Sequence, residues 1–223
     1  MDRSILLIYT GGTIGMKIDP QSQALAPFDF SHILEEVPEL KKFGYKLDSY
    51  SFDPVIDSSD ANIPFWQEIA RIIEENYSKY DGFVVLHGTD TMSYTASMLS
   101  FMLENLGKPV IFTGSQLPIG MLRTDGKENL ISSIEIAAAK DEEDRAMVPE
   151  VCVYFESQLY RGNRTTKYNA ENFRAFRSAN FPVLADVGIH IKFHQELIRY
   201  PKWGKEFKVH YNLDRNVAIV KVV

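Results

Sequence analysis

The sequence has one cysteine, no long apolar run and no excess of basic charge. The single cysteine among its 223 residues, Cys152, excludes an internal disulfide and a cysteine-rich metal site. The apolar runs at 5–8 and 83–86 fall far short of the roughly 20 residues that a membrane-spanning helix needs. With 30 acidic against 24 basic residues, the formal net charge is −6, whereas nucleic-acid binding calls for a basic face. We therefore expect neither a membrane nor a nucleic acid as a partner.

Two nucleotide-binding motifs and a secretion signal are also missing. The glycine-rich segment Thr10–Gly15 contains neither G-x-G-x-x-G nor Gly-Lys-Ser/Thr, which argues against a dinucleotide site and against a Walker A loop. The N-terminus lacks the long apolar region and the small-residue cleavage site of a signal peptide. We therefore expect a cytoplasmic protein.

Short apolar runs alternate with helical patterns along the chain. The runs lie at Ile5–Tyr9, Phe83–Leu86, Val110–Phe112 and Val151–Phe155, as expected of strands buried on both faces of a parallel sheet. Apolar stripes with helical spacing predict helices over 64–77 and 92–106, and a third helix is expected over 128–139. The alternation predicts an α/β fold with a doubly wound, mainly parallel sheet and helices on both faces.

Glycines and hydroxyl residues follow three of the predicted strands. These segments are Thr10-Gly11-Gly12-Thr13, His87-Gly88-Thr89-Asp90-Thr91 and Thr113-Gly114-Ser115-Gln116. In doubly wound sheets, ligands bind at the carboxyl ends of the strands. The three segments are therefore the expected binding edge of this sheet.

Each of these segments also has an ordinary structural interpretation. On spacing alone, Thr13 lies equally well in a tight turn or in a nucleophile loop, and Asp90 or Thr91 could cap a helix. His87 is expected to be a packed or orienting histidine rather than a base. Lys167 would be a surface lysine in most proteins, although a partly desolvated lysine can accept a proton.

Four motifs in order make the pattern specific. They are Tyr9-Thr10-Gly11-Gly12-Thr13-Ile14-Gly15-Met16, Asp57-Ser58-Ser59-Asp60, His87-Gly88-Thr89-Asp90-Thr91-Met92 and Tyr160-Arg161-Gly162-Asn163-Arg164-Thr165-Thr166-Lys167. In this combination the chain resembles the bacterial L-asparaginase family, and the cytoplasmic type I branch in particular. The resemblance implies hydrolysis of L-asparagine to L-aspartate and ammonia by a homodimer or homotetramer, without a metal or another cofactor.

The resemblance also implies roles for individual residues. Thr13 would be the nucleophile that attacks the side-chain amide and forms an acyl-enzyme. Lys167 would draw the proton from the hydroxyl of Thr89, with Asp90 completing this second triad. The family's substrate-binding and regulatory positions correspond to Asp57, Ser58, Ser59, Asp90 and Thr89 for the amino acid, Gly12 and Gly88 for the oxyanion, Ser115 beside the leaving ammonia, and Thr166 in an allosteric site.

The resemblance further implies a division of the chain and one departure from the family. Residues 1–190 would form the catalytic domain, 191–213 an interdomain linker, and 214–223 the first strand of a truncated C-terminal domain. The family carries a tyrosine on the lid that helps to activate the nucleophile, whereas residues 14–30 contain no tyrosine. Alignment on Pro27 places Leu25 or a neighbour at that position.

Two other functions stay open at this stage. The chain could be a truncated or non-catalytic domain that binds asparagine without efficient turnover, because the lid tyrosine and the C-terminal domain are missing. It could also be a subunit of a tRNA-dependent amidotransferase, whose core resembles the same family. The acidic net charge gives no support to tRNA binding.

Overall fold

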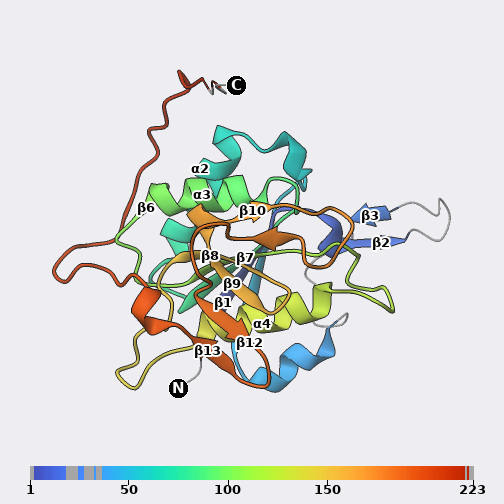
Figure 1. The fold of residues 1–223 in the computed structure, drawn as a ribbon, viewed down its shortest axis with the longest axis horizontal. Coiled ribbons are helices and arrows are strands. Elements are labelled where there is room, and N and C mark those ends of the chain that lie inside the picture. The colour runs from blue at the N-terminus through green and yellow to red at the C-terminus, as the bar shows by residue number, and fades with distance from the viewer. Residues whose placement is uncertain (1–2, 19–24, 28–32, 34–36, 219, 221–223) are drawn as a thin grey trace.

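The computed structural model describes residues 3–18, 25–27, 33, 37–218 and 220. Its centre is an eight-stranded sheet with the order β13-β12-β9-β8-β7-β5-β1-β4 (Figure 1). The strands are β1 (Ser4–Tyr9), β4 (Lys46–Ser51), β5 (Gly82–Leu86), β7 (Val110–Thr113), β8 (Val151–Phe155), β9 (Gln158–Arg161), β12 (Ala185–Val187) and β13 (Ile191–Phe193). The five strands from β8 to β4 are parallel, and β9, β12 and β13 extend one edge in antiparallel pairing. The predicted mainly parallel sheet is confirmed.

Smaller elements lie around this sheet. They are η1 (Thr13–Gly15), β2 (Met16–Ile18), β3 (Leu25–Pro27), η3 (Pro38–Phe43), η4 (Ser58–Asp60), β6 (Leu103–Glu104), η5 (Gly162–Arg164), β10 (Thr166–Lys167), β11 (Phe176–Arg177), η6 (Gln195–Leu197) and β14 (Lys208–Val209). β2 and β3 form a hairpin that projects from the body of the molecule (Figure 1). β10 pairs with β11, and β14 pairs with β6.

Helices cover both faces of the sheet, as predicted. α2 (Ile63–Asn76) and α3 (Met92–Met102) lie on one face, and α4 (Gly126–Ala138) lies on the other (Figure 1). Alternate residues of β1 point to the two layers: Leu6 and Ile8 pack with α2 and α3, whereas Ile5 and Leu7 pack with α4. This alternation buries both faces of β1, which explains its continuous apolar run.

The order of the parallel strands reverses at β1. From β1 the chain passes to β4 on one side and then to β5 on the other side of β1. In open α/β sheets such a reversal leaves a crevice at the carboxyl ends of the two strands, where ligands bind. The segments that follow β1 and β5 are Thr10–Gly15 and His87–Thr91, so two of the predicted motifs lie at this crevice.

The predicted helix over 92–106 is too long by one turn. α3 ends at Met102, because Leu103 and Glu104 pair with Val209 and Lys208 in a short antiparallel ladder. Asn105 then adopts a left-handed backbone conformation with φ of 56°, which a helix cannot contain. The sequence did not reveal this partner because it lies about a hundred residues farther along the chain.

The segment from 191 to 213 packs against the domain. Residues 191–193, predicted as the start of the linker, form β13 at the edge of the main sheet. Phe207 stacks on Tyr77 of the α2 layer, with ring centroids 3.9 Å apart. Residues 214–218 and 220 form no strand, and 219 and 221–223 lie outside the described residues. The division into domain, linker and terminal strand therefore stays a prediction.

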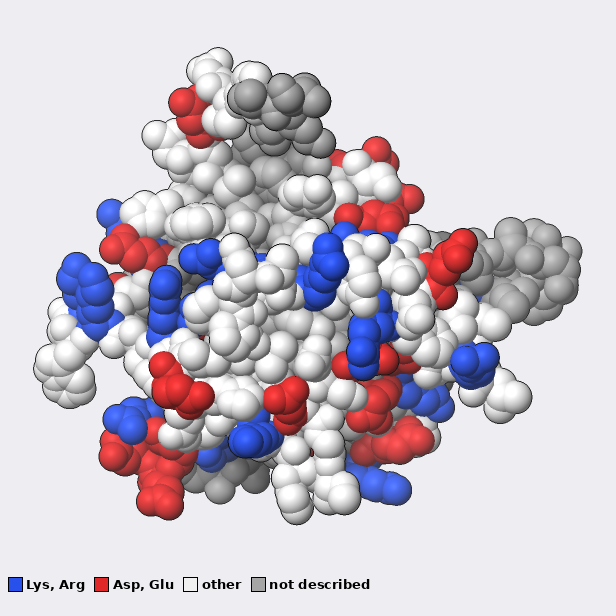
Figure 2. Space-filling model, in the orientation of Figure 1, with Lys and Arg blue, Asp and Glu red and all other residues white. Residues whose placement is uncertain are grey.

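Acidic and basic side chains are interspersed on the face that Figure 2 shows, without a broad basic area. In the described ranges, no helix is long and apolar enough to cross a membrane. Cys152 is fully buried in β8.

Candidate active site

The loops after β1 and β5 meet backbone to backbone through two glycines. A Cβ atom on Gly12 would lie 2.6 Å from the nitrogen and 2.7 Å from the Cα of Gly88. Gly12 also has a φ of 90°, a conformation that L-residues with side chains rarely adopt. The glycine motifs therefore exist to bring the segment of Thr13 against the segment of Thr89.

The Asp57–Ser59 segment completes this junction. Ser58 is 4% exposed, and a Cβ atom on Gly88 would lie 2.5 Å from its Oγ. Asp57 caps η4, because its carboxylate accepts a hydrogen bond from the Ser59 N–H at 2.9 Å. The Thr91 hydroxyl donates to the Ser58 carbonyl at 2.6 Å. Thr91 therefore does not cap α3 through its side chain, and the capping interpretation of this residue is wrong.

We expect Gly88→Ala to disrupt this junction. The added methyl group would overlap Ser58, and relieving that overlap should cost roughly 1–3 kcal/mol of the free energy of unfolding. Urea denaturation of the variant measures this loss. Gly188→Ala is the matched control, because a Cβ atom at Gly188 would meet no atom within 4 Å. Equal stability of the two variants would contradict the close packing.

Lys167 joins Thr89 and Asp90 in one hydrogen-bonded group. Its Nζ lies 2.8 Å from the Thr89 Oγ1 and 2.8 Å from the Asp90 Oδ1. The Lys167 side chain is 15% exposed, whereas that of Asp90 is 66% exposed. Thr89 and Asp90 lie 78 and 77 positions before Lys167 in the chain. The contacts of Lys167 with both residues are those expected of the Thr89–Asp90–Lys167 triad.

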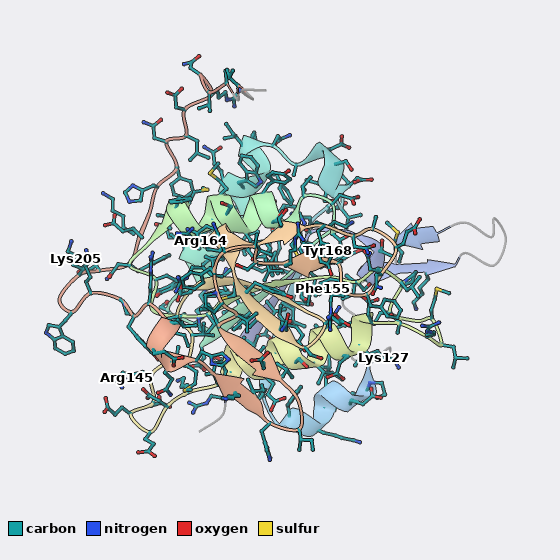
Figure 3. The ribbon with its side chains drawn as sticks, in the orientation of Figure 1. Lys127, Arg145, Phe155, Arg164, Tyr168 and Lys205 are labelled. Atoms are coloured by element: carbon teal, nitrogen blue, oxygen red, sulfur yellow. The ribbon has the colours of Figure 1, made fainter. Side chains whose placement is uncertain are left out.

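The hairpin of β10 and β11 positions Lys167. In this pairing Lys167 lies opposite Phe176. Phe176 is buried and packs on Phe155 at the end of β8, with ring centroids 5.0 Å apart. In Figure 3, Tyr168, which follows Lys167, and Lys127 of α4 lie toward the β2–β3 hairpin, whereas Arg145 and Lys205 lie at the opposite end. The lysine is therefore delivered to the carboxyl edge of the sheet by a strand anchored in the core.

Thr13 is the first residue of η1 and is half-buried. Within the described part of the chain, no hydrogen-bond partner is found for its hydroxyl group. Tyr9 supports this turn from below: its hydroxyl donates to the Gly15 carbonyl at 3.1 Å, and a Cβ atom on Gly15 would lie 2.3 Å from the Tyr9 ring. Tyr9 is 1% exposed, and burial raises its pKa to about 12.

Three other predicted residues have less distinctive surroundings. Ser115 is buried and its hydroxyl donates to the Leu117 carbonyl. Thr166 is exposed and its hydroxyl lies 3.4 Å from the Lys167 carbonyl. Leu25 lies in β3 opposite Ile18, and much of the predicted lid, at 19–24 and 28–30, lies outside the described residues. The roles of all three residues stay predictions.

His87 is packed in the core rather than exposed to the crevice. It is 1% exposed, and its ring lies 5.4 Å from that of Phe65 and 5.9 Å from that of Phe112. Its Nδ1–H donates to the Gly88 carbonyl at 2.7 Å. Burial lowers the pKa of His87 to about 4, so the ring is neutral at pH 7. The prediction of a packed, orienting histidine agrees with this geometry.

The buried His87 predicts a specific pH dependence of stability. Its folded pKa of about 4 lies below the ordinary value of 6.5, so between these values the unfolded chain binds a proton that the folded chain rejects. The free energy of unfolding should therefore fall as the pH falls through this window, by at most about 1.4 kcal/mol per pH unit.

Urea denaturation from pH 7 to pH 4.5 tests this dependence. His87→Gln should reduce the change of the free energy of unfolding with pH, because the contribution of the buried histidine is lost. His190→Gln, which changes an exposed histidine, should leave that pH dependence unaltered. In the unaltered protein, the NMR signal of the His87 ring should titrate near pH 4. A midpoint near 6.5 would contradict the neutral buried ring.

Gln116 is a site residue whose role the sequence did not reveal. Its Oε1 lies 3.2 Å from the Thr89 Oγ1, and its backbone N–H is held by the Asp125 carboxylate at 3.1 and 3.0 Å. Its place directly after Ser115 in the third glycine and hydroxyl segment was the available signal. Among the described residues, no group of three or more His, Cys, Asp or Glu side chains could hold a metal ion.

Most of the chain matches a known protein family. The family model for the N-terminal domain of asparaginase matches residues 4–199. The chain belongs to the asparaginase family. L-asparaginase 1 of Escherichia coli K12 is 48% identical to this asparaginase-family chain over 191 residues, which cover 85% of the chain and 55% of the relative. The 60 kDa lysophospholipase of Mus musculus is 39% identical over 242 residues, covering 99% of the chain and 42% of the relative.

A solved structure of an asparaginase has the same fold. L-asparaginase I of Vibrio cholerae superposes with a TM-score of 0.81 at 42% identity, covering 94% of this chain and 61% of that one. This asparaginase-family chain thus spans about half the length of the curated relatives it matches. The predicted family and the predicted α/β fold are both confirmed.

Proposed function

We propose that the chain is an L-asparagine amidohydrolase that releases L-aspartate and ammonia. The observation that carries the proposal is the group formed by Lys167, Thr89 and Asp90 at the crevice between β1 and β5. Thr13 lies in the other loop of the same crevice, joined to the Thr89 loop through Gly12 and Gly88. The 48% identity to a relative named L-asparaginase supports the substrate.

The proposed reaction begins with attack by the Thr13 hydroxyl on the side-chain carbonyl carbon of L-asparagine. The resulting tetrahedral oxyanion is stabilised by backbone N–H groups of the two glycine-containing loops. As this intermediate collapses, the proton given up by the Thr13 hydroxyl passes to the departing nitrogen, the carbon–nitrogen bond breaks, ammonia leaves, and an ester of Thr13 remains. Water then hydrolyses the ester to L-aspartate and restores the threonine.

Thr89, Asp90 and Lys167 supply proton transfer and substrate recognition in this proposal. Once Lys167 has given up a proton, its amine can take the hydrogen of the Thr89 hydroxyl, which lies 2.8 Å away. The exposed carboxylate of Asp90 has room to meet the ammonium group of the substrate. Asp57, Ser58 and Ser59 bind the rest of the amino acid, and Ser115 lies beside the departing ammonia.

The two alternatives receive less support. A binding domain without turnover would not need a partly buried lysine held between a hydroxyl and a carboxylate. A tRNA-dependent amidotransferase would gain nothing from the acidic net charge of −6. A cytoplasmic location and a homo-oligomer are part of the proposal.

Ammonia release from L-asparagine by the purified chain tests the proposal. The expected result is steady release that Thr13→Ala abolishes. Binding of L-asparagine without release would favour the binding domain instead.

A further inference from the structure

The side-chain amide of Gln116 connects both partners of the Thr89–Lys167 pair. Its Nε2 donates to the carbonyl groups of Ala170 at 2.9 Å and Asn172 at 3.2 Å. Both carbonyl groups belong to the loop that follows Lys167 in the β10–β11 hairpin. Its Oε1 lies 3.2 Å from the Thr89 hydroxyl. Gln116 therefore touches the hydroxyl on one side and the loop next to the lysine on the other.

The groups at the two ends of this hydrogen-bond network, the loop carbonyls and the lysine, fix which atom donates in each hydrogen bond. Carbonyl oxygens can only accept, so the NH₂ group of Gln116 must face Ala170 and Asn172, and its Oε1 must face Thr89. The Lys167 ammonium group can only donate, so Thr89 accepts from it. The single hydrogen of the Thr89 hydroxyl is then donated to the Gln116 Oε1.

This arrangement gives Gln116 influence over the proton of Thr89. While Lys167 is charged, the hydroxyl hydrogen rests on Gln116. When Lys167 is neutral, that hydrogen must turn from Gln116 to the amine before it can be transferred. Lys167 also pairs with the Asp90 carboxylate at 2.8 Å. With a charged lysine both hydrogen bonds of Thr89 are satisfied, whereas the turn toward a neutral amine breaks the bond to Gln116.

The rest of Gln116 is anchored firmly enough to hold this position. The Asp125 carboxylate at the start of α4 accepts from the backbone N–H of Gln116 and from that of Leu117. The Asn129 Nδ2 donates to the same carboxylate at 3.3 Å and to the Gly114 carbonyl at 3.0 Å. The start of α4 therefore fixes the backbone from which the Gln116 side chain reaches Thr89.

We propose that Gln116 is a positioning residue that orients the Thr89 hydroxyl hydrogen and ties it to the loop of Lys167. This inference rests on the proposed function, because it concerns proton transfer at the same site. A residue that only fastened the loop would affect stability but would leave the pH dependence of turnover unchanged.

Gln116→Met and Gln116→Glu separate the two possibilities. Methionine has a similar shape but accepts no comparable hydrogen bond, so Lys167 should give up its proton more readily. Glutamate still accepts from Thr89 through one oxygen, its other oxygen cannot donate to the Ala170 and Asn172 carbonyls, and its negative charge favours a charged lysine. The pH of half-maximal kcat/KM on the ascending limb should therefore move down for methionine and up for glutamate. The kcat of Gln116→Met should fall about tenfold, with KM changed less than about twofold.

Gln67→Met is the matched control. Gln67 in α2 also makes a side-chain hydrogen bond to a backbone carbonyl, that of Tyr211 at 2.8 Å, but it is not part of the site. Its replacement should leave kcat and the ascending limb unchanged. An unshifted ascending limb in both Gln116 variants, or shifts in the same direction, would overturn the orienting role.

Amide hydrogen exchange tests the contact between Gln116 and the loop even if the chain does not turn over L-asparagine. Gln116→Met should speed amide exchange in the loop from 168 to 175, because two hydrogen bonds to that loop are lost, and unchanged exchange would overturn the tie to the loop. Wild-type chain that releases no ammonia would refute the proposed function, and the exchange result would still decide whether Gln116 holds the loop. Normal turnover that Lys167→Met abolishes, with Gln116 variants identical to wild type, would refute only the role of Gln116.

Discussion

Thr13→Ala should release ammonia from L-asparagine at least roughly 10⁴-fold more slowly than the unaltered chain, because removing the proposed nucleophile leaves only binding and oxyanion stabilisation. The hydroxyl group has no hydrogen-bond partner among the described residues, so its removal breaks no hydrogen bond within that part of the chain. The variant should therefore unfold at the same urea concentration as wild type. A coupled assay for ammonia, together with calorimetry of asparagine binding, measures both consequences.

Thr13→Ser is the matched variant for this prediction. It keeps a hydroxyl group in the same loop, so it should retain part of the activity that alanine loses. Calorimetry should find asparagine bound by Thr13→Ala within about tenfold of the wild-type affinity. Undiminished ammonia release by Thr13→Ala would show that another group attacks the amide.

Lys167→Met should lower kcat by roughly 10²–10⁴-fold, the range expected when a group that transfers protons is lost. Methionine preserves most of the length of the lysine stem, so the β10–β11 hairpin should keep its place over Phe155. Asp90 is largely exposed, and loss of its ion pair should change the free energy of unfolding by less than about 1 kcal/mol.

Lys192→Met is the control for the loss of one positive charge. Lys192 is an exposed lysine on the edge strand β13, remote in sequence from the site segments. Its kcat and KM should equal those of wild type. A kcat for Lys167→Met within twofold of wild type would contradict the proton-transfer role.

The sequence was sufficient to predict the elements whose signal is local. The stripe of Phe65, Ile69, Ile72 and Ile73 predicted α2, and all four side chains are buried as one face. Continuous apolar runs predicted β1, β5, β7 and β8, because strands covered on both faces leave no position for polar residues. The short strands β12 and β13 escaped prediction, since each has only three residues and an exposed charged residue, Asp186 or Lys192, at its centre.

The site was predicted only as far as its motifs were recognised. Glycine and hydroxyl residues after the strands pointed to the correct edge of the sheet, but nothing local assigned Lys167 to it. Its partner Thr89 lies 78 positions away, and the role followed from the family resemblance alone. Gln116 was missed because its contacts with Thr89 and Asn172 span 27 and 56 positions. Such contacts depend on how the loops fold together rather than on residue spacing.

We propose that this chain hydrolyses the side-chain amide of L-asparagine. The most direct test is the yield of ammonia and L-aspartate from L-asparagine incubated with the purified chain at neutral pH, with Thr13→Ala and Lys167→Met beside it. We predict equal amounts of the two products from the unaltered chain and almost none from either variant. Asparagine that stays intact while bound to the unaltered chain, or ammonia release that both variants retain, would contradict the claim.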